Sequence, residues 1–505
     1  MPKFRAVDIG YENPLLRMEE ARVIAALSSV KRKISGHAPI ASLPPELLEE
    51  IFHICVSWLY GCLTPKHRLA YTQVCSSWRR ISLNSSRLWQ RIDLCDSRLA
   101  DEFLLRSKQA PLSIVSASPR NLTTDNLTMH ASRLRSIDVV LFPDAMVHLF
   151  SIMAPNLSSL ASLSLKVSPV LSTVDLDISV PLVRRLFLDT VAIRWQDCQK
   201  LTHLSLRGIT PQLCPSLSQL YDMFKRSPLL EYVRLENLMP SLESFEASSR
   251  PLIPLLHLKE MVISGQQSIV SALLSGISLA THTRLRLYLS LSEDLRSLLP
   301  RGLPYATNHR STSISTVRLS LNGTHFLRPG VPAWSDDPDH TLFSISSALP
   351  VSTRVCSSLD HLLDLSRIIK LELNTGVLQG IPMDDLRALF ASLVNLETLC
   401  TAFNDLEDLW VVLNAIDTER ATSRLYAPRL VRLSFSKPAD LWWHFTDRWM
   451  SFVLSFVQAR LLHSVPLQGI EFLRCHGVSI ESTQELRALV PQVIVSDRIG
   501  TKSCF

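Results

Sequence analysis

The chain has 505 residues, of which 46% are hydrophobic and 19% are charged, and its formal net charge is +6 at pH 7. This composition excludes an intrinsically disordered chain, and the length suffices for two to four domains or one long repeat array. Only 14 residues are glycine, which argues against the glycine-rich loops that hold phosphate groups. We therefore predict a large folded protein, and we find no motif for a cofactor.

Charge, cysteine content and hydropathy indicate where such a chain would operate. Basic residues in the first 110 positions are interleaved with glutamates along helix faces, which favours solvated helices over a nucleic-acid surface. The ten cysteines form no C-x-x-C pair and indicate reduced thiols. The first residues lack the apolar core of a signal peptide, and no apolar run approaches membrane-spanning length. We expect a cytoplasmic or nuclear protein without a membrane span.

An amphipathic helix is predicted over residues 15–34, where apolar residues recur at helical spacing. Packing against the segment that follows is favoured over a short coiled coil, because only about three heptads fit. Gly36 and Pro39 end the helix and form a linker. Residues 1–37 are thus predicted to be a helix and its linker.

Residues 38–95 are predicted to form a small helical unit. The Leu-Pro-Pro-Glu motif at 43–46 suits the start of a helix, because proline is tolerated in the first turn and glutamate favours the positive helix end. Residues 47–55 form a wide apolar face, and a second helix is predicted from about 66 to 80. Residues 92–94 alternate like a first strand. So small a unit cannot bury all of its apolar surface, and we expect part of it to contact another protein.

From about residue 131 to residue 498 the sequence is self-similar, whereas residues 96–130 are predicted to be a connecting segment. The repeating unit is an apolar triad spaced L-x-x-L-x-L, often followed by a helix-like run. Its period is often about 26–29 residues, which is typical of a long leucine-rich repeat. Because no unit buries its apolar face alone, the array must stack into a solenoid of strand-and-helix units. Clear copies begin at Leu134, Leu160, Leu201, Leu230, Leu258, Ile368, Leu430 and Leu467.

The array departs from the full repeat pattern in two ways. The Asn or Cys expected three residues after the triad is replaced by Ser168, Ile209 or Leu238, which predicts irregular turns. A weaker copy is formed by Leu182 with residues 186 and 188. A region rich in Pro, Ser and Asp also predicts a loop insertion near 322–345.

Four short motifs follow one another in the helical unit: Leu-Pro-Pro-Glu at 43–46, Ile-Phe at 51–52, Val-Cys-Ser-Ser-Trp at 74–78 and Leu-Trp at 88–89. In this order they resemble the F-box, whose pattern is Leu-Pro-x-Glu, Ile-Phe, Val-Cys-x-x-Trp and Leu-Trp. An F-box followed by leucine-rich repeats is similar to the substrate receptors of Skp–cullin–F-box ubiquitin ligases. The degenerate repeats resemble the large F-box families of mushroom-forming fungi.

The resemblance implies an α/β protein with an N-terminal helical F-box and an irregular leucine-rich-repeat solenoid. It also implies a surface for the Skp-type adaptor, made of Leu43, Pro44, Leu47, Leu48, Ile51, Phe52, Val74, Cys75, Trp78 and Trp89. Val74, Cys75, Trp78 and Trp89 match positions that either build the helical unit or complete that surface. Packing inside the unit is an equally good interpretation for Ile51 and Trp78. Leu43 and Pro44 favour the adaptor interface.

The implied function is that of a non-catalytic receptor, which binds the adaptor, and through it a cullin, and presents an unknown target protein for ubiquitin-dependent degradation. The alternative is a scaffold or adaptor that uses the same two regions for protein binding without ubiquitin transfer. The sequence holds no G-x-S-x-G, G-x-G-x-x-G, P-loop or H-E-x-x-H motif, so no catalytic residue is predicted.

Two side-chain clusters remain. His53, Cys55 and Cys75 lie near one further cysteine and one further histidine in the sequence, but the spacing of these residues matches no common zinc site. The cysteines at 55 and 75 are instead predicted to be buried on helix faces. An aromatic run between 442 and 456 predicts a core helix. Trp442 and Trp443 cannot both point inward on a helix, so one of them is a candidate anchor for a target.

Overall fold

The computed structural model divides the chain into two compact units, which are described separately. One contains residues 1–140 and 155–159, and the other contains residues 141–154 and 160–505. The structure describes residues 14–496 except for 37–38, 59–68, 96, 117–124, 170–172, 239, 241–251, 281, 291–315, 321–322, 328–340, 348–364, 374–380, 403–405, 415, 418–423, 437–446, 474 and 476–477.

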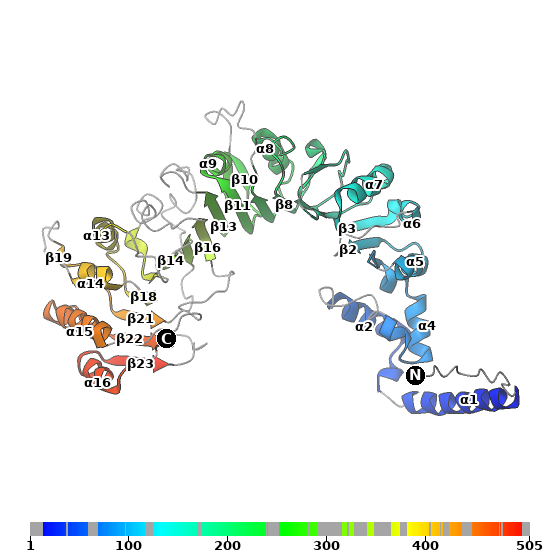
Figure 1. The fold of residues 1–505 in the computed structure, drawn as a ribbon, viewed down its shortest axis with the longest axis horizontal. Coiled ribbons are helices and arrows are strands. Elements are labelled where there is room, and N and C mark those ends of the chain that lie inside the picture. Colours follow the sequence, from blue (N-terminus) through cyan, green and yellow to red (C-terminus); the bar gives the residue numbers. More distant parts are fainter. Residues whose placement is uncertain are drawn as a thin grey trace, which may run out of the picture. The chain divides into compact units, whose positions relative to one another are not determined.

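The first unit is mainly helical and ends in three short parallel strands (Figure 1). Strand β1 pairs with β2, and β2 pairs with β3. Residues 96–130, predicted to be a connecting segment, contribute helix α5 (Ser97–Arg106), strand β2 (Leu112–Ser116) and helix α6 (Asp125–Thr128). The elements are α1 (Pro14–Gly36), α2 (Pro45–Trp58), α4 (Ser76–Asn84), β1 (Arg91–Asp93), α5 (Ser97–Arg106), β2 (Leu112–Ser116), α6 (Asp125–Thr128) and β3 (Leu134–Leu141), with 3-10 turns at Pro39–Ser42, Ala70–Thr72, Ser86–Trp89 and Ala131–Arg133.

Helix α1 confirms the helix predicted over 15–34, but not its packing. Three residues of its predicted apolar stripe, Val23, Leu27 and Val30, are all more than half exposed. The interpretation that this stripe packs on the following segment is therefore wrong for these three residues.

The second unit repeats a strand followed by a helix or an irregular connection. Its helices are α7 (Pro143–Met153), α8 (Leu217–Lys225), α9 (Gln267–Ser275), α13 (Met383–Ser392), α14 (Leu406–Asn414), α15 (Asp447–Leu462) and α16 (Ile480–Leu489). The strands of the main sheet are β4 (Ser162–Val167), β6 (Arg185–Asp189), β8 (His203–Arg207), β9 (Tyr232–Glu236), β11 (Glu260–Gln266), β13 (Arg284–Ser290), β14 (Thr316–Ser320), β15 (Gly323–Leu327), β16 (Thr341–Ser347), β17 (Lys370–Leu373), β18 (Thr398–Ala402), β21 (Arg432–Ser436), β22 (Gly469–Leu473) and β23 (Gln492–Ser496). Two-residue or three-residue strands form small pairs beside it: β5 (Val174–Asp175) with β7 (Val191–Ala192), β10 (Ile253–Leu255) with β12 (Ile277–Leu279), and β19 (Ile416–Asp417) with β20 (Arg424–Leu425).

The strands stack in parallel and nearly in chain order, as a solenoid requires. Strands β4, β6, β8, β9, β11 and β13 follow one another, and β17, β18, β21, β22 and β23 form a second parallel run. Figure 1 shows α8 and α9 on one side of the first run, and α13 to α16 on one side of the second. The fold class predicted from the sequence, helices followed by an irregular strand-and-helix array, is confirmed.

Between the two runs the stacking order reverses. Strand β16 pairs with β13 in parallel, β15 pairs with both β16 and β14 in antiparallel fashion, and β14 pairs with β17 in parallel. The predicted loop insertion at 322–345 thus contains strand β15 and the start of β16, while residues 328–340 lie outside the described part of the chain. The sequence signal for a loop does not reveal that its two ends pair within the sheet.

The triads build the core. The first residue of every clear copy is at most 2% exposed, and alternating strand residues point into the same interior. The weaker copy differs only at its first position: Leu186 and Leu188 are buried as predicted, but Leu182 is 57% exposed and Val183 is buried instead. Val183, Leu186 and Leu188 have the same spacing as the clear copies, so Val183 and not Leu182 is the first core residue of this unit.

Candidate functional site

Helix α2 carries apolar residues on two faces. Its start is fixed by the amides of Leu47 and Leu48, which donate to the Pro44 carbonyl at 3.1 and 3.2 Å. Leu48 and Phe52, four residues apart, are buried with Val56 in the interior of the unit. The adjoining face carries Leu47, which is 53% exposed.

Phe52 is the centre of the interior of this small unit. Its ring lies 5.0 Å from the ring of Tyr71 and 4.8 Å from that of Trp78, measured between centroids. Trp78 is only half-buried, so one part of the indole packs on Phe52 while another part reaches the surface. Trp78 therefore packs inside the unit with one part of its side chain, and contact of the remaining part with an adaptor stays a prediction.

Cys75 begins helix α4 rather than lying within a helix. Its backbone is extended, and its thiol accepts the amide of Trp78 at 3.5 Å, as an N-cap residue does. The second helix thus starts at Ser76, later than predicted, because residues 73–75 do not have helical structure. Cys55 and Cys75 are both only half-buried, so the prediction of buried thiols on helix faces is wrong for both.

Two polar contacts join α2 to the segment after α4. The Ser85 hydroxyl donates to the Glu49 carboxylate, and the Arg87 guanidinium lies 3.3 Å from the Glu50 carboxylate. The second pair is half exposed on both sides and contributes little stability by itself. These contacts orient the residues that lead to Trp89.

Trp89 lies in the interior and not at a surface. Its side chain is 1% exposed, its indole N–H donates to the Ser82 carbonyl at 2.8 Å, and its ring meets that of Phe103 edge-on at 5.0 Å. The guanidinium of Arg106 lies 4.7 Å above the same ring. Trp89 therefore packs the F-box-like segment against α5, which the sequence pattern does not reveal.

The structure divides the ten predicted adaptor-binding residues into two sets. Three of them, Leu48, Phe52 and Trp89, are interior residues. This corrects the assignment of Leu48 and Phe52 to the surface, and for Trp89 it agrees with the alternative that the side chain builds the helical unit. The other seven are exposed or half-exposed: Leu43, Pro44, Leu47, Ile51, Val74, Cys75 and Trp78. Ile54 is 45% exposed and joins this set, although sequence reasoning missed it. The sequence does indicate it, because Ile54 follows the half-exposed Ile51 by three residues and Leu47 by seven, which places all three on one face of a helix.

The second unit contains the predicted aromatic run, of which the structure describes only the helical part. Trp442 and Trp443 lie outside the described residues. The core helix predicted there is α15, whose buried Phe456 packs 5.3 Å from the Trp410 ring.

Within the part of the chain that the structure describes, no group of three metal-ligating side chains is present, and no helix is long and apolar enough to cross a bilayer. Burial raises the pKa of the Cys198 thiol to about 12, so this cysteine stays protonated and is a poor nucleophile at neutral pH.

No curated protein matches this chain. Among solved structures, the leucine-rich repeat-containing protein LegL7 from Legionella pneumophila is similar at 14% identity and a TM-score of 0.28, covering 60% of this chain and 87% of its own. The complex of Rad7 and Elc1 from yeast is similar at 11% identity and a TM-score of 0.24, covering 85% of this chain and 96% of its own. The F-box-like family model matches residues 40–95, and the N-terminal helical segment is accordingly an F-box-like domain.

Proposed function

We propose that this chain is the substrate-recognition subunit of a Skp–cullin–F-box ubiquitin ligase. In this proposal the F-box-like domain binds a Skp-type adaptor, the adaptor links it to a cullin, and the strand-and-helix array binds a target protein. The observation that carries the proposal is the apolar surface of α2 and its flanks, which remains exposed within a segment that matches the F-box-like model.

The exposed side chains have the properties of an interface core. Leu47 and Val74 are 53% and 60% exposed, and half-exposed Ile51 and Trp78 adjoin the buried Phe52. Full burial of one such aliphatic side chain contributes about 1.5–3 kcal/mol, so a partner that covers several of them gains enough to stabilise a complex. Charged residues are scarce at the centre of protein interfaces, and this set is apolar.

The proposed role involves no bond chemistry by this chain. A receptor that holds a target beside a ubiquitin-charged enzyme raises the effective concentration of target lysines. Such a receptor would act in the cytoplasm or the nucleus.

The test is co-purification of the full chain with a Skp-type adaptor, comparing the wild type with a Leu47→Asp, Val74→Asp double variant. Leu47 is the third residue of α2, where an aspartate is favoured by the helix dipole, so the variant should remain folded. Leu105→Asp is the matched control, because Leu105 is 74% exposed on α5, away from this set. We expect the double variant to lose the adaptor and the control to retain it.

Retention of the adaptor by the double variant would contradict the assigned surface. Recovery of a cullin together with the adaptor distinguishes the ligase receptor from the alternative, a scaffold without ubiquitin transfer. An adaptor complex that never contains a cullin would favour the scaffold.

A further inference from the structure

Five neighbouring strands of the second unit present one continuous outer face. Strands β6, β8, β9, β11 and β13 are paired in parallel and in register. Their inward residues are buried apolar side chains, while most of the alternating outward residues are polar, charged or aromatic. We call this the strand face; its rows are Arg185, His203, Tyr232, Glu260 and Arg284; then Phe187, Ser205, Arg234, Val262 and Arg286; then Asp189, Arg207, Glu236, Ser264 and Tyr288.

Aromatic rings stack across three strands of the strand face. The His203 ring is stacked on that of Tyr232 at 4.6 Å, and the ring of Phe187 lies 6.4 Å from His203. Lys259 extends the stack, with its ammonium 5.8 Å from the Tyr232 ring centroid. Phe187 and Tyr232 are each 37% exposed, so this stack offers aromatic surface to a partner. Tyrosine and arginine are the residue types enriched at binding hot spots.

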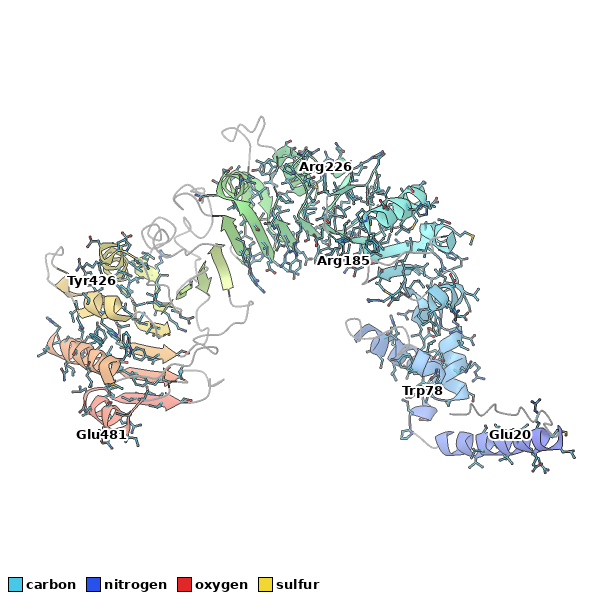
Figure 2. All side chains as sticks on the ribbon, viewed as in Figure 1. Glu20, Trp78, Arg185, Arg226, Tyr426 and Glu481 are labelled. Carbon is cyan, nitrogen blue, oxygen red and sulfur yellow. The ribbon has the colours of Figure 1, made fainter. Side chains whose placement is uncertain are left out.

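Arginines outnumber carboxylates on the same face. Glu236 is shared by Arg207 at 3.6 Å and Arg234 at 3.7 Å. Arg185 is exposed, and among the described residues no carboxylate pairs with it. Figure 2 shows Arg185 on the strand side of this unit and Arg226, which follows α8, on the helix side. The strand face as a whole holds the arginines 185, 207, 234, 284 and 286 against the carboxylates Asp189, Glu236 and Glu260.

We propose that the strand face binds an extended, Asp- or Glu-containing peptide segment of the target, with an apolar or aromatic side chain seated on the stack. The carboxylates would pair with Arg185 and with the free donors of Arg207 and Arg234, since a guanidinium has five N–H donors and one shared carboxylate does not use them all. Neighbouring strands lie about 4.8 Å apart, so the five strands span about 19 Å, the length of about six extended residues.

The acids on the strand face favour a peptide over a nucleic acid. A phosphate backbone places negative charge at regular, close intervals and is bound by continuous basic surfaces. Here Glu236 lies beside Arg207 and Arg234, and Glu260 pairs with Arg286 at 3.3 Å, so both carboxylates would repel such a backbone. A peptide can instead place its few carboxylates beside the arginines and neutral residues beside the glutamates.

This inference rests on the proposed function, because it names the chemistry of the target that the receptor would hold. Its test does not require the adaptor: binding is measured by fluorescence anisotropy on the full chain alone. The probe is a labelled pool of 12-residue peptides with Glu or Asp at alternate positions and Phe at the centre. The comparison probes carry Lys in place of the acids, or Ala in place of Phe, and a 12-nucleotide RNA serves as the nucleic-acid probe.

The variants are Arg185→Glu and Arg234→Glu, with Arg226→Glu as the matched control on the helix side. We expect the acidic pool to bind, each strand-face variant to weaken its affinity about tenfold, and the control to change it less than twofold. The strand-face variants should still co-purify with the adaptor, which separates failure of this inference from failure of the proposed function. No binding of the acidic pool, equal binding of the Lys pool, tighter binding of RNA, or an equal loss with Arg226→Glu would overturn it.

Discussion

Replacing Trp89 by alanine should unfold the end of the F-box-like domain rather than delete a contact with a partner. The side chain is 1% exposed and packs on Phe103, and its indole donates to the Ser82 carbonyl at 2.8 Å. Truncation of a buried tryptophan costs about 3–5 kcal/mol, and the lost hydrogen bond adds about 1 kcal/mol. The sum is comparable to the whole stability of a marginal domain, about 5 kcal/mol.

The assay is hydrogen exchange followed by mass spectrometry, because a chain of two units does not unfold in a single step. We expect Trp89→Ala to speed hydrogen exchange in α4, β1 and α5. Trp89→Phe keeps a ring against Phe103 and should lower the free energy of local opening by only about 1–2 kcal/mol. Leu105→Ala is the exposed control and should change protection by less than about 0.5 kcal/mol. If Trp89→Ala leaves exchange unchanged and yet abolishes adaptor binding, the side chain is an interface residue and its assignment to the interior is refuted.

Three further predictions concern the second unit. The buried Arg460 guanidinium donates to the carbonyls of residues 427, 428, 430 and 465. Arg460→Met should therefore lower the free energy of local opening near α15, measured by hydrogen exchange, by about 1–3 kcal/mol. Arg460→Lys should lower it more, because lysine keeps a buried charge with fewer donors. The exposed Arg429→Met is its control, and equal effects would contradict this reasoning. A Cβ at Gly276 would lie 2.4 Å from the Tyr221 ring, so Gly276→Ala should cost about 1–3 kcal/mol in the same assay, whereas a change near zero would show that the ring moves freely. Burial holds the pKa of His203 below its usual 6.5, so the folded state favours the neutral ring, and local stability should fall as the pH drops below about 6.5. His203→Gln should remove this pH dependence. If the pH dependence persists in the variant, it belongs to another group.

The repeat array could be predicted because its physical requirement is simple. An apolar triad that is buried in every clear copy leaves a regular trace in the sequence, and the strands follow from it. The reversal of order at β14, β15 and β16 could not be predicted, because it depends on which strand edges pair and not on the local pattern. Leu182 and Val183 are a different case, because Val183 lies three residues before Leu186, as in the clear copies, and the sequence spacing alone favours it as the buried residue.

The F-box-like surface was predictable as a segment but not side chain by side chain. Leu47 and Leu48 are identical and adjacent, yet one is 53% exposed and the other 3%. Which of them faces outward depends on where Phe52 finds its aromatic neighbours, a tertiary fact that α2 does not encode by itself. Likewise, Trp89 is part of a recognisable motif, but its partner Phe103 lies in a segment that the sequence presents as a connection.

The turns explain how the array persists without the Asn or Cys expected after each triad. At those positions Ile209 and Leu238 are buried apolar residues, and the residue before each, Gly208 or Asn237, has a positive φ. In this left-handed conformation the Gly208 amide donates to the Glu236 carbonyl at 3.0 Å, and the Asn237 amide donates to that of Ser264 at the same distance.

At Gly208 and Asn237 the backbone ladder therefore continues into the bend without a side chain, whereas the Thr210 amide, just beyond the first of these bends, donates to the Thr173 hydroxyl at 2.8 Å. At the opposite end of the strands, different residues tie successive repeats together: Ser227 accepts the Leu201 amide, and Asn395 donates to the Ser366 carbonyl. The requirement is a satisfied backbone rather than a particular residue type. The missing motif predicts irregular turns, and this stays a prediction for the array; at the two bends of Ile209 and Leu238 the requirement is met by the backbone itself, through a residue in the left-handed conformation.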